Sequence, residues 1–202
     1  FGIACDVTNK TALKNAVEQT IKQFGGLDLL ISNAGIFSPG AAIENTDEKI
    51  WEQSLSLNLT SHRQLLQACI PYLEYGINSS IVIIGSKNVP APGPGAASYS
   101  VAKAGLTQRA RVAALELGKK NIRVNVIHPN AVFDTGIWTD EILKARAQQY
   151  GISVQAYKTN NVLQTEVTSA DVAAAALQLL GSAFSKTTGA QIPVDGGNDR
   201  VI

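Results

Sequence analysis

The stretch SIVIIGSKNVPAPGPGAASYSVAK, residues 80–103, indicates the fold of this chain more clearly than any other. Ser80–Ile84 is an apolar run typical of a buried β-strand. Residues 90–95, rich in proline and glycine, predict a loop, because they suit neither a helix nor a central strand. A long helix is expected over residues 96–118. A strand followed by a helix in this way is half of a βαβ unit, which builds parallel sheets.

The same alternation continues on both sides of this stretch. Strands are expected at residues 2–7, 27–32, 122–128 and 190–194, and helices at residues 11–24 (with Thr8 as N-cap), 47–75, 140–150 and 171–180. No repeat or long linker divides the chain. The pattern therefore predicts one α/β domain over residues 1–202, with a doubly wound parallel sheet flanked by helices.

The composition of the chain argues against several classes of protein. The chain has 202 residues, is 45% hydrophobic and has a net charge of +1, which argues against disorder and against nucleic-acid binding. No apolar run is long enough for a membrane span, and no secretory signal opens the sequence. Cys5 and Cys69 suggest free thiols in a reducing, cytoplasmic setting. His62 and His128 have no acidic partner at ligand spacing, so we expect no metal site.

Three side chains suggest chemistry at one edge of the predicted sheet. Tyr99 and Lys103 are four residues apart and share a helix face, and Ser86 follows the preceding strand. Ligands of parallel sheets bind at the carboxyl ends of the strands. A nearby ammonium would lower the pKa of a tyrosine so that it can exchange a proton with an alcohol or carbonyl oxygen. Ser86 could hold the same oxygen by a hydrogen bond.

This spacing, with Ser32-Asn33-Ala34-Gly35 after an earlier strand and Asn58 between, resembles the short-chain dehydrogenase/reductase family. The resemblance implies an NAD- or NADP-dependent oxidoreductase with a Rossmann-like sheet and a catalytic tetrad. In that tetrad Tyr99 is the acid–base, Lys103 holds the nicotinamide ribose, Ser86 binds the substrate oxygen and Asn58 positions a water. It also implies cofactor contacts from Asp6, Val7, Asn33, Ala34, Gly35, Tyr99, Lys103, Pro129 and Val132.

The chain departs from the family pattern at its start. It has no glycine-rich phosphate turn, and we expect a truncated domain that lacks the first two strands of the sheet. Asn130 replaces the usual glycine after Pro129, and we expect it to adopt a positive φ. Two functions therefore remain open. One is an active dehydrogenase in the parent protein, with little activity in this piece alone, and the other is a non-catalytic fragment or oligomerisation unit that cannot hold the cofactor.

A closer likeness concerns residues 85–95 and 136–138, which resemble the dehydrogenase part of bifunctional rhamnulose-phosphate aldolase/alcohol dehydrogenases. It implies an aldolase domain upstream and a small hydroxy-aldehyde or sugar-derived substrate. Lys87 and Asn88 would contact a polar or phosphorylated substrate, and Trp138 would either line the pocket or pack within its loop. The apolar residues on several faces of the two long helices predict a homodimer or homotetramer.

Overall fold

In the computed structural model, which describes residues 1–38 and 40–198, a single parallel sheet forms the centre of the molecule. Its four described strands are β1 (Leu29–Ser32), β2 (Ser80–Ile84), β3 (Arg123–Pro129) and β4 (Gln191–Val194). They lie side by side in chain order, and each neighbouring pair is parallel. The α/β class and the parallel sheet predicted from the sequence are confirmed.

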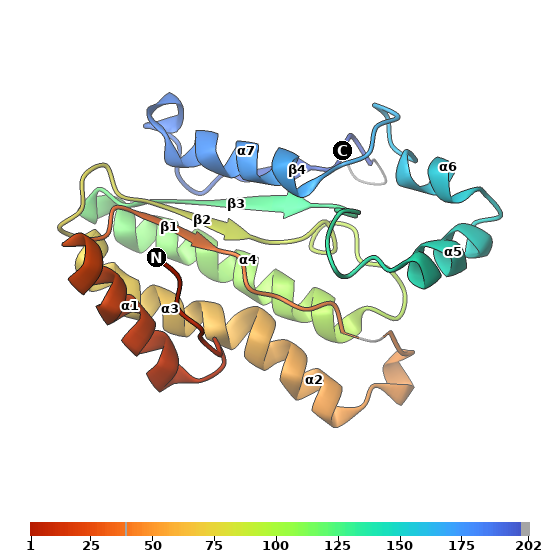
Figure 1. Cartoon of the computed structure of the whole chain (residues 1–202), viewed down its shortest axis with the longest axis horizontal. Helices are drawn as coiled ribbons and strands as arrows, with labels where there is room; N and C mark the ends of the chain where they lie inside the picture. Colours follow the sequence, from red (N-terminus) through yellow and green to blue (C-terminus); the bar gives the residue numbers. More distant parts are fainter. Residues whose placement is uncertain (39, 199–202) are drawn as a thin grey trace.

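Helices cover both faces of this sheet (Figure 1). One face carries the helices within residues 10–24, 48–73 and 97–117, and the other face carries the helix of residues 169–180. Two shorter helices lie beyond the carboxyl ends of the strands. The helices are α1 (Lys10–Phe24), α2 (Glu48–Leu55), α3 (Ser61–Leu73), α4 (Ala97–Leu117), α5 (Asp140–Gln149), α6 (Val154–Lys158) and α7 (Ser169–Leu180).

The core is divided by the sheet into two apolar clusters, because successive side chains of a strand point to opposite faces. Ile81 and Ile83 of β2 pack with Leu66 of α3 and Leu106 of α4. Val82, between them in sequence, belongs to the other cluster, which includes Leu179 of α7. The continuous apolar run of β2 is therefore explained by burial on both sides, as expected for a central parallel strand.

The helix predicted over residues 47–75 forms, with an interruption that the sequence pattern did not indicate. Between α2 and α3 the chain makes a π-helical turn at Ser56–Thr60. Asn58, at the middle of this turn, is completely buried. Such wide turns inside helices often occur at functional sites, since they redirect one side chain without ending the helix.

The strand expected at residues 2–7 is wrong, since the structure gives this segment no strand. The segment ends in a turn in which the Asp6 carboxylate accepts hydrogen bonds from Thr8, and Cys5 and Val7 pack on the core. The free edge of β1 has no described partner, and Leu29 on that strand is 46% exposed. An isolated extended segment cannot satisfy its backbone groups without a neighbouring strand, which explains the error.

Two local expectations are also corrected. Asn9, and not Thr8, is the N-cap of α1, since its side chain accepts hydrogen bonds from the backbone N–H groups of Thr11 and Ala12. After Pro129 the positive φ occurs at Ala131, with a φ of 42°, and not at Asn130. Among the described residues, no helix is long and apolar enough to cross a membrane.

Candidate active site

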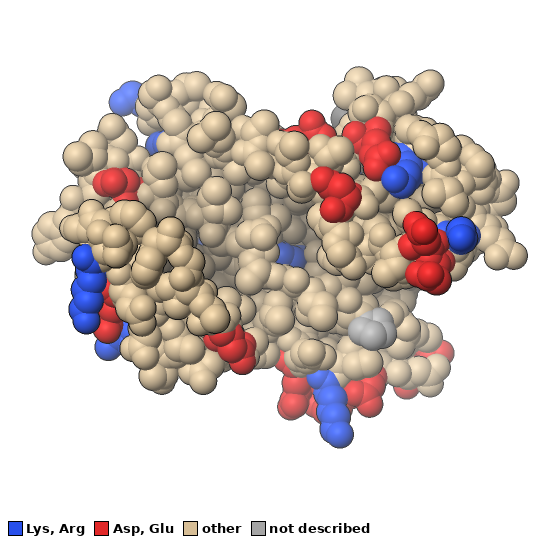
Figure 2. Space-filling model, viewed as in Figure 1, with Lys and Arg blue, Asp and Glu red and all other residues tan. Residues whose placement is uncertain are grey.

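The residues predicted to carry chemistry come from β2, α4 and the π-helical turn, and the fold brings them together. Ser86 lies two residues after the end of β2, and its side chain is hydrogen-bonded to Tyr99 near the start of α4. Lys103, one turn further along α4, places its Nζ 5.8 Å from the centre of the Tyr99 ring. Figure 2 shows a hollow on one face of the molecule whose visible surface is mostly uncharged.

Asn58 fixes the loop that follows β1. Its Oδ1 accepts a hydrogen bond from the Ile36 N–H at 3.0 Å, and its Nδ2 donates to the Ile36 carbonyl at 3.0 Å. A Cβ atom added to Gly35 would lie 3.1 Å from Asn58 Oδ1 and 3.4 Å from Lys103 Nζ. Glycine at this position therefore allows the loop to approach both side chains closely.

Burial has the largest effect on the pKa values of Tyr99 and Lys103, which both lie on α4. Desolvation lowers the pKa of Lys103 to about 8, and its ammonium donates to the Ile84 carbonyl at 2.9 Å. Desolvation raises the pKa of Tyr99, and the hydrogen bond from Ser86 opposes that rise. The pKa of Tyr99 is therefore raised and not lowered as the sequence suggested, because the burial of the phenol outweighs the hydrogen bond from Ser86.

The turn Asn33-Ala34-Gly35 is held from behind by His62 of α3. One ring nitrogen, Nε2, lies 2.8 Å from the Ala34 carbonyl oxygen, and Nδ1 lies 2.6 Å from the Ser32 hydroxyl. A neutral ring with its proton on Nε2 donates to Ala34 and accepts from Ser32. Asn33 and Gly35 are themselves exposed, so the turn presents its front to solvent.

The two residues after Ser86 are held by the protein itself. Lys87 Nζ lies 2.6 Å from Oδ2 of Asp195, and both side chains are less than a tenth exposed. The Asn88 N–H donates to Ser86 Oγ at 3.1 Å. The ion pair with Asp195, which sequence reasoning missed, means that the Lys87 charge is already compensated within the fold.

Trp138 belongs to an aromatic cluster. Its ring centre lies 4.9 Å from that of Phe133 and 6.1 Å from that of Tyr157. Trp138 therefore packs against aromatic residues of the segment that runs from the end of β3 into α6. A second aromatic contact was not predicted: the ring centre of Phe37 lies 4.8 Å from that of Tyr99. In the sequence, only the position of Phe37 shortly after the Asn33-Ala34-Gly35 turn could have suggested this contact.

The other residues predicted to bind the cofactor lie before α1, in the case of Asp6 and Val7, and at or just after the end of β3, in the case of Pro129 and Val132. Asp6 is exposed, and its hydrogen bonds with Thr8 lower the pKa of its carboxyl. Pro129 ends β3, and its carbonyl accepts the Lys87 N–H at 2.9 Å. The Val132 carbonyl accepts the Thr135 hydroxyl at 2.8 Å. A cofactor role for Asp6, Val7, Pro129 and Val132 stays a prediction.

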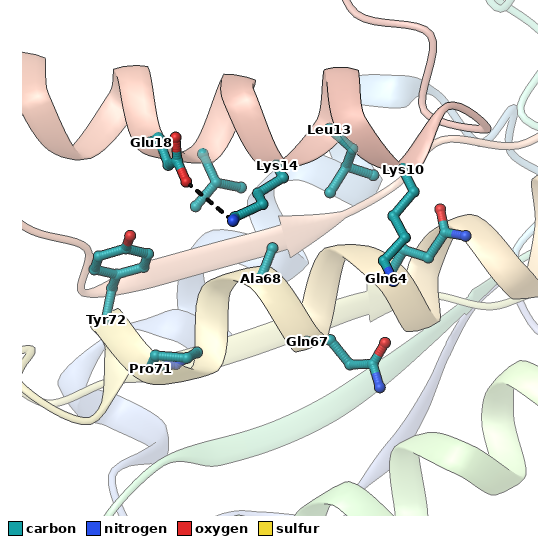
Figure 3. A pocket seen from close by; sticks show the side chains of 10 residues that line it. Lys10, Leu13, Lys14, Glu18, Gln64, Gln67, Ala68, Pro71 and Tyr72 are labelled. Carbon is teal, nitrogen blue, oxygen red and sulfur yellow. Dashed lines mark ion pairs between the residues drawn. The ribbon is translucent and has the colours of Figure 1, made fainter.

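A groove of about 440 Å³ between α1 and α3 is separate from these residues (Figure 3). Lys14 and Glu18 face each other across 3.6 Å on one of its walls. None of the four predicted catalytic residues lines this groove. Across the part of the chain that the structure describes, no three histidine, cysteine, aspartate or glutamate side chains gather as a metal site.

Comparisons with known proteins agree with this arrangement. A family model described as enoyl-(acyl carrier protein) reductase matches residues 1–199. An uncharacterized NAD-dependent oxidoreductase of Mycobacterium tuberculosis is 32% identical over 95% of this chain and 70% of its own length. The chain therefore belongs to the short-chain dehydrogenase/reductase family.

Other similar proteins show how the chain relates to longer ones. The uncharacterized oxidoreductase YuxG of Bacillus subtilis is 31% identical, and the match covers 98% of this chain but 29% of that protein. The structure of an NAD⁺-bound xylitol dehydrogenase is similar with a TM-score of 0.88 and 25% identity, covering 96% of this chain and 78% of that one. An NADPH-bound short-chain oxidoreductase of Pseudomonas aeruginosa has a TM-score of 0.88 and 27% identity, covering 100% and 77%.

Proposed function

We propose that the protein is a nicotinamide-dependent oxidoreductase that interconverts an alcohol and a carbonyl. The observation that carries this proposal is the meeting of Ser86, Tyr99, Lys103 and Asn58 at the carboxyl edge of the sheet. Such an edge is where α/β folds bind their ligands. The NAD⁺ and NADPH in the similar structures support the proposed cofactor class.

In this proposal Tyr99 gives a proton to a carbonyl oxygen or takes one from an alcohol. The Ser86 hydroxyl accepts from the Asn88 N–H and donates to the Tyr99 oxygen, so it lies beside the atom that exchanges the proton. When a substrate oxygen is present, Ser86 holds it by the same donor. Lys103, whose pKa is lowered to about 8, would donate to the ribose hydroxyls of the cofactor and exchange protons with a water that Asn58 positions.

The turn at Asn33-Ala34-Gly35 fits a nicotinamide cofactor. It is exposed in front and braced by His62 behind, and Gly35 leaves open the space near Lys103 Nζ that a Cβ would fill. A bound nicotinamide would supply hydride transfer, while Tyr99 and Ser86 would handle the oxygen and its proton.

The test is turnover of the whole protein with NAD and NADP over a panel of small alcohols and aldehydes. Tyr99→Phe removes only the ionisable oxygen, and we expect kcat to fall by about 10²–10⁴-fold with an unchanged circular dichroism spectrum. Tyr75→Phe, at a side chain that is 90% exposed, is the matched control. Near-normal turnover in Tyr99→Phe would reject the assignment, and an inactive wild type would favour a non-catalytic unit.

For the substrate, we propose a small hydroxy-aldehyde or a sugar-derived alcohol without a phosphate. The Lys87–Asp195 pair supports a neutral substrate, because the lysine charge is compensated. The similarity to a xylitol dehydrogenase agrees with a polyol-like compound. We also propose an aldolase domain in the parent protein, on the likeness of residues 85–95 and 136–138, and the match to 29% of YuxG shows that a similar sequence occurs within a longer protein. Aldol cleavage by the purified whole protein tests this.

The exposed apolar side chains of α4 support a homodimer or homotetramer formed through α4 and the α2–α3 helix. Leu115 is 79% exposed, Val101 49% and Val112 43%. Burying such side chains in a second copy would remove apolar surface from water. Light scattering should show an oligomer for the wild type and a shift toward monomer for Leu115→Lys. Leu177→Lys on α7, 66% exposed, is the control that should leave the mass unchanged.

A further inference from the structure

His128 lies against the residues that lead into the proposed site. It is the sixth residue of β3, and Ile84 of β2 pairs in register with Ile127 of β3. The next residues along both strands, Gly85 and His128, are therefore neighbours at the carboxyl edge. The His128 side chain is 4% exposed, although nothing in the proposed reaction uses it.

The His128 ring contacts the backbone of Ser86 on both sides of its Cα. Nδ1 lies 3.2 Å from the Ser86 nitrogen and 2.9 Å from the Ser86 carbonyl oxygen. The other ring nitrogen lies 3.1 Å from Oε1 of Gln191 on β4. Because Gln191 Oε1 can only accept, Nε2 carries the ring proton, and Nδ1 accepts a hydrogen bond from the Ser86 N–H. The ring is thereby bound to the Ser86 backbone.

Gly85 provides the room for this ring. A Cβ atom built on Gly85 would lie 2.7 Å from Nδ1 and 2.9 Å from Cε1 of His128. Real Cβ atoms do not approach ring atoms this closely, so any other residue at position 85 would displace the imidazole or the strand. The φ of Gly85 is not positive, and the glycine is therefore required by space and not by backbone conformation.

The contact between His128 and the Ser86 backbone also determines where the Ser86 hydroxyl lies. Its Oγ is tied to the Asn88 N–H and to Tyr99, and both bonds depend on where the Ser86 backbone lies. We propose that His128 is a positioning residue for Ser86, fixing its backbone so that the hydroxyl meets a substrate oxygen beside Tyr99, and that Gly85 is the glycine that admits the ring. This inference rests on the proposed function for its catalytic part.

Three variants of His128 test the roles of its two ring nitrogens separately. Asparagine can place a polar atom near the Nδ1 position, glutamine reaches toward the Nε2 position, and leucine provides neither. We expect His128→Asn to keep kcat within about threefold, and His128→Gln and His128→Leu to lower it by about 10–100-fold, the range for a misplaced reacting group. Equal losses in all three variants would overturn the inference.

A double-mutant cycle distinguishes positioning from general packing. If His128 acts through Ser86, His128→Leu should change kcat by less than about twofold in a Ser86→Ala background. A full additional loss in that background would show a role independent of Ser86 and overturn the proposal.

The contact at Gly85 is measured by thermal unfolding, in which Gly85→Ala should cost less stability in a His128→Ala protein than in the wild type. An equal cost in both would reject the steric part.

Amide hydrogen exchange at Ser86 makes the test independent of turnover. The Ser86 N–H should be protected in the wild type and in His128→Asn, and should exchange about tenfold faster or more in His128→Leu. Unchanged exchange in His128→Leu would overturn the inference even in an active enzyme. A wild type without turnover but with this exchange pattern would reject the proposed function while leaving the His128–Ser86 contact established.

Discussion

We expect Arg123 to contribute strongly to stability, because its guanidinium caps the carboxyl end of α7. Nη1 donates to the Leu179 carbonyl at 2.7 Å and to the Phe184 carbonyl at 3.0 Å. Nη2 donates to the Leu180 carbonyl at 2.8 Å and to the Gly181 carbonyl at 3.3 Å. The last carbonyls of a helix have no partner within the helix, so the arginine satisfies groups that would otherwise need water.

Arg123→Met keeps most of the aliphatic stem and removes all four bonds. Counting only the two shortest, at about 1.5 kcal/mol for a hydrogen bond to a charged group, the variant should lose about 3 kcal/mol of unfolding free energy. For a chain of this size, that loss corresponds to a fall in Tm of about 6–12 °C. We expect Arg123→Lys to recover part of the loss, because an ammonium cannot reach all four carbonyls as a planar fork does.

Urea unfolding followed by circular dichroism measures these differences. Arg111→Met on α4 is the matched control, since Arg111 is exposed and its guanidinium donates to the Gln108 side chain at 3.1 Å. The control should change stability by no more than about 0.5 kcal/mol. If Arg123→Met lost no more than the control, the carbonyls of α7 would be equally well satisfied by water and the reasoning would fail.

Two further predictions concern the core beside the proposed site. Burial lowers the pKa of His62 to about 4, whereas an unfolded imidazole takes up its proton near pH 6.5; stability present above pH 6.5 should therefore fall by up to about 3 kcal/mol as the pH drops toward 4. Unfolding at several pH values should show a smaller slope in His62→Asn, and an unchanged slope would contradict the assignment. Leu66→Ala, at a side chain with 0% exposure, should cost about 2–5 kcal/mol through the cavity it leaves. A loss as small as that of the exposed Leu177→Ala, measured in the same urea titration, would refute it.

Much of the proposed site could be predicted because its residues follow local rules. Tyr99 and Lys103 share a face through the helical repeat, and Ser86 closely follows a strand that its apolar run makes easy to predict. The π-helical turn at Asn58 could not be predicted in this way, because it depends on how α2 and α3 fit against the sheet. The expected direction of the Tyr99 pKa shift was also wrong, since spacing does not show how deeply a phenol is buried.

By itself the sequence determined the parallel α/β class and most of the alternation of strands and helices, although the strand expected at residues 2–7 and the Thr8 cap were wrong. These features follow from backbone periodicity and capping, which act over a few residues. Only the tertiary structure decided that Lys87 meets Asp195, 108 residues away, and that His128 meets Ser86, 42 residues away. Such pairs arise because the register of β2, β3 and β4 brings their carboxyl ends to one edge, and buried polar groups there must find partners among whatever the sheet places beside them.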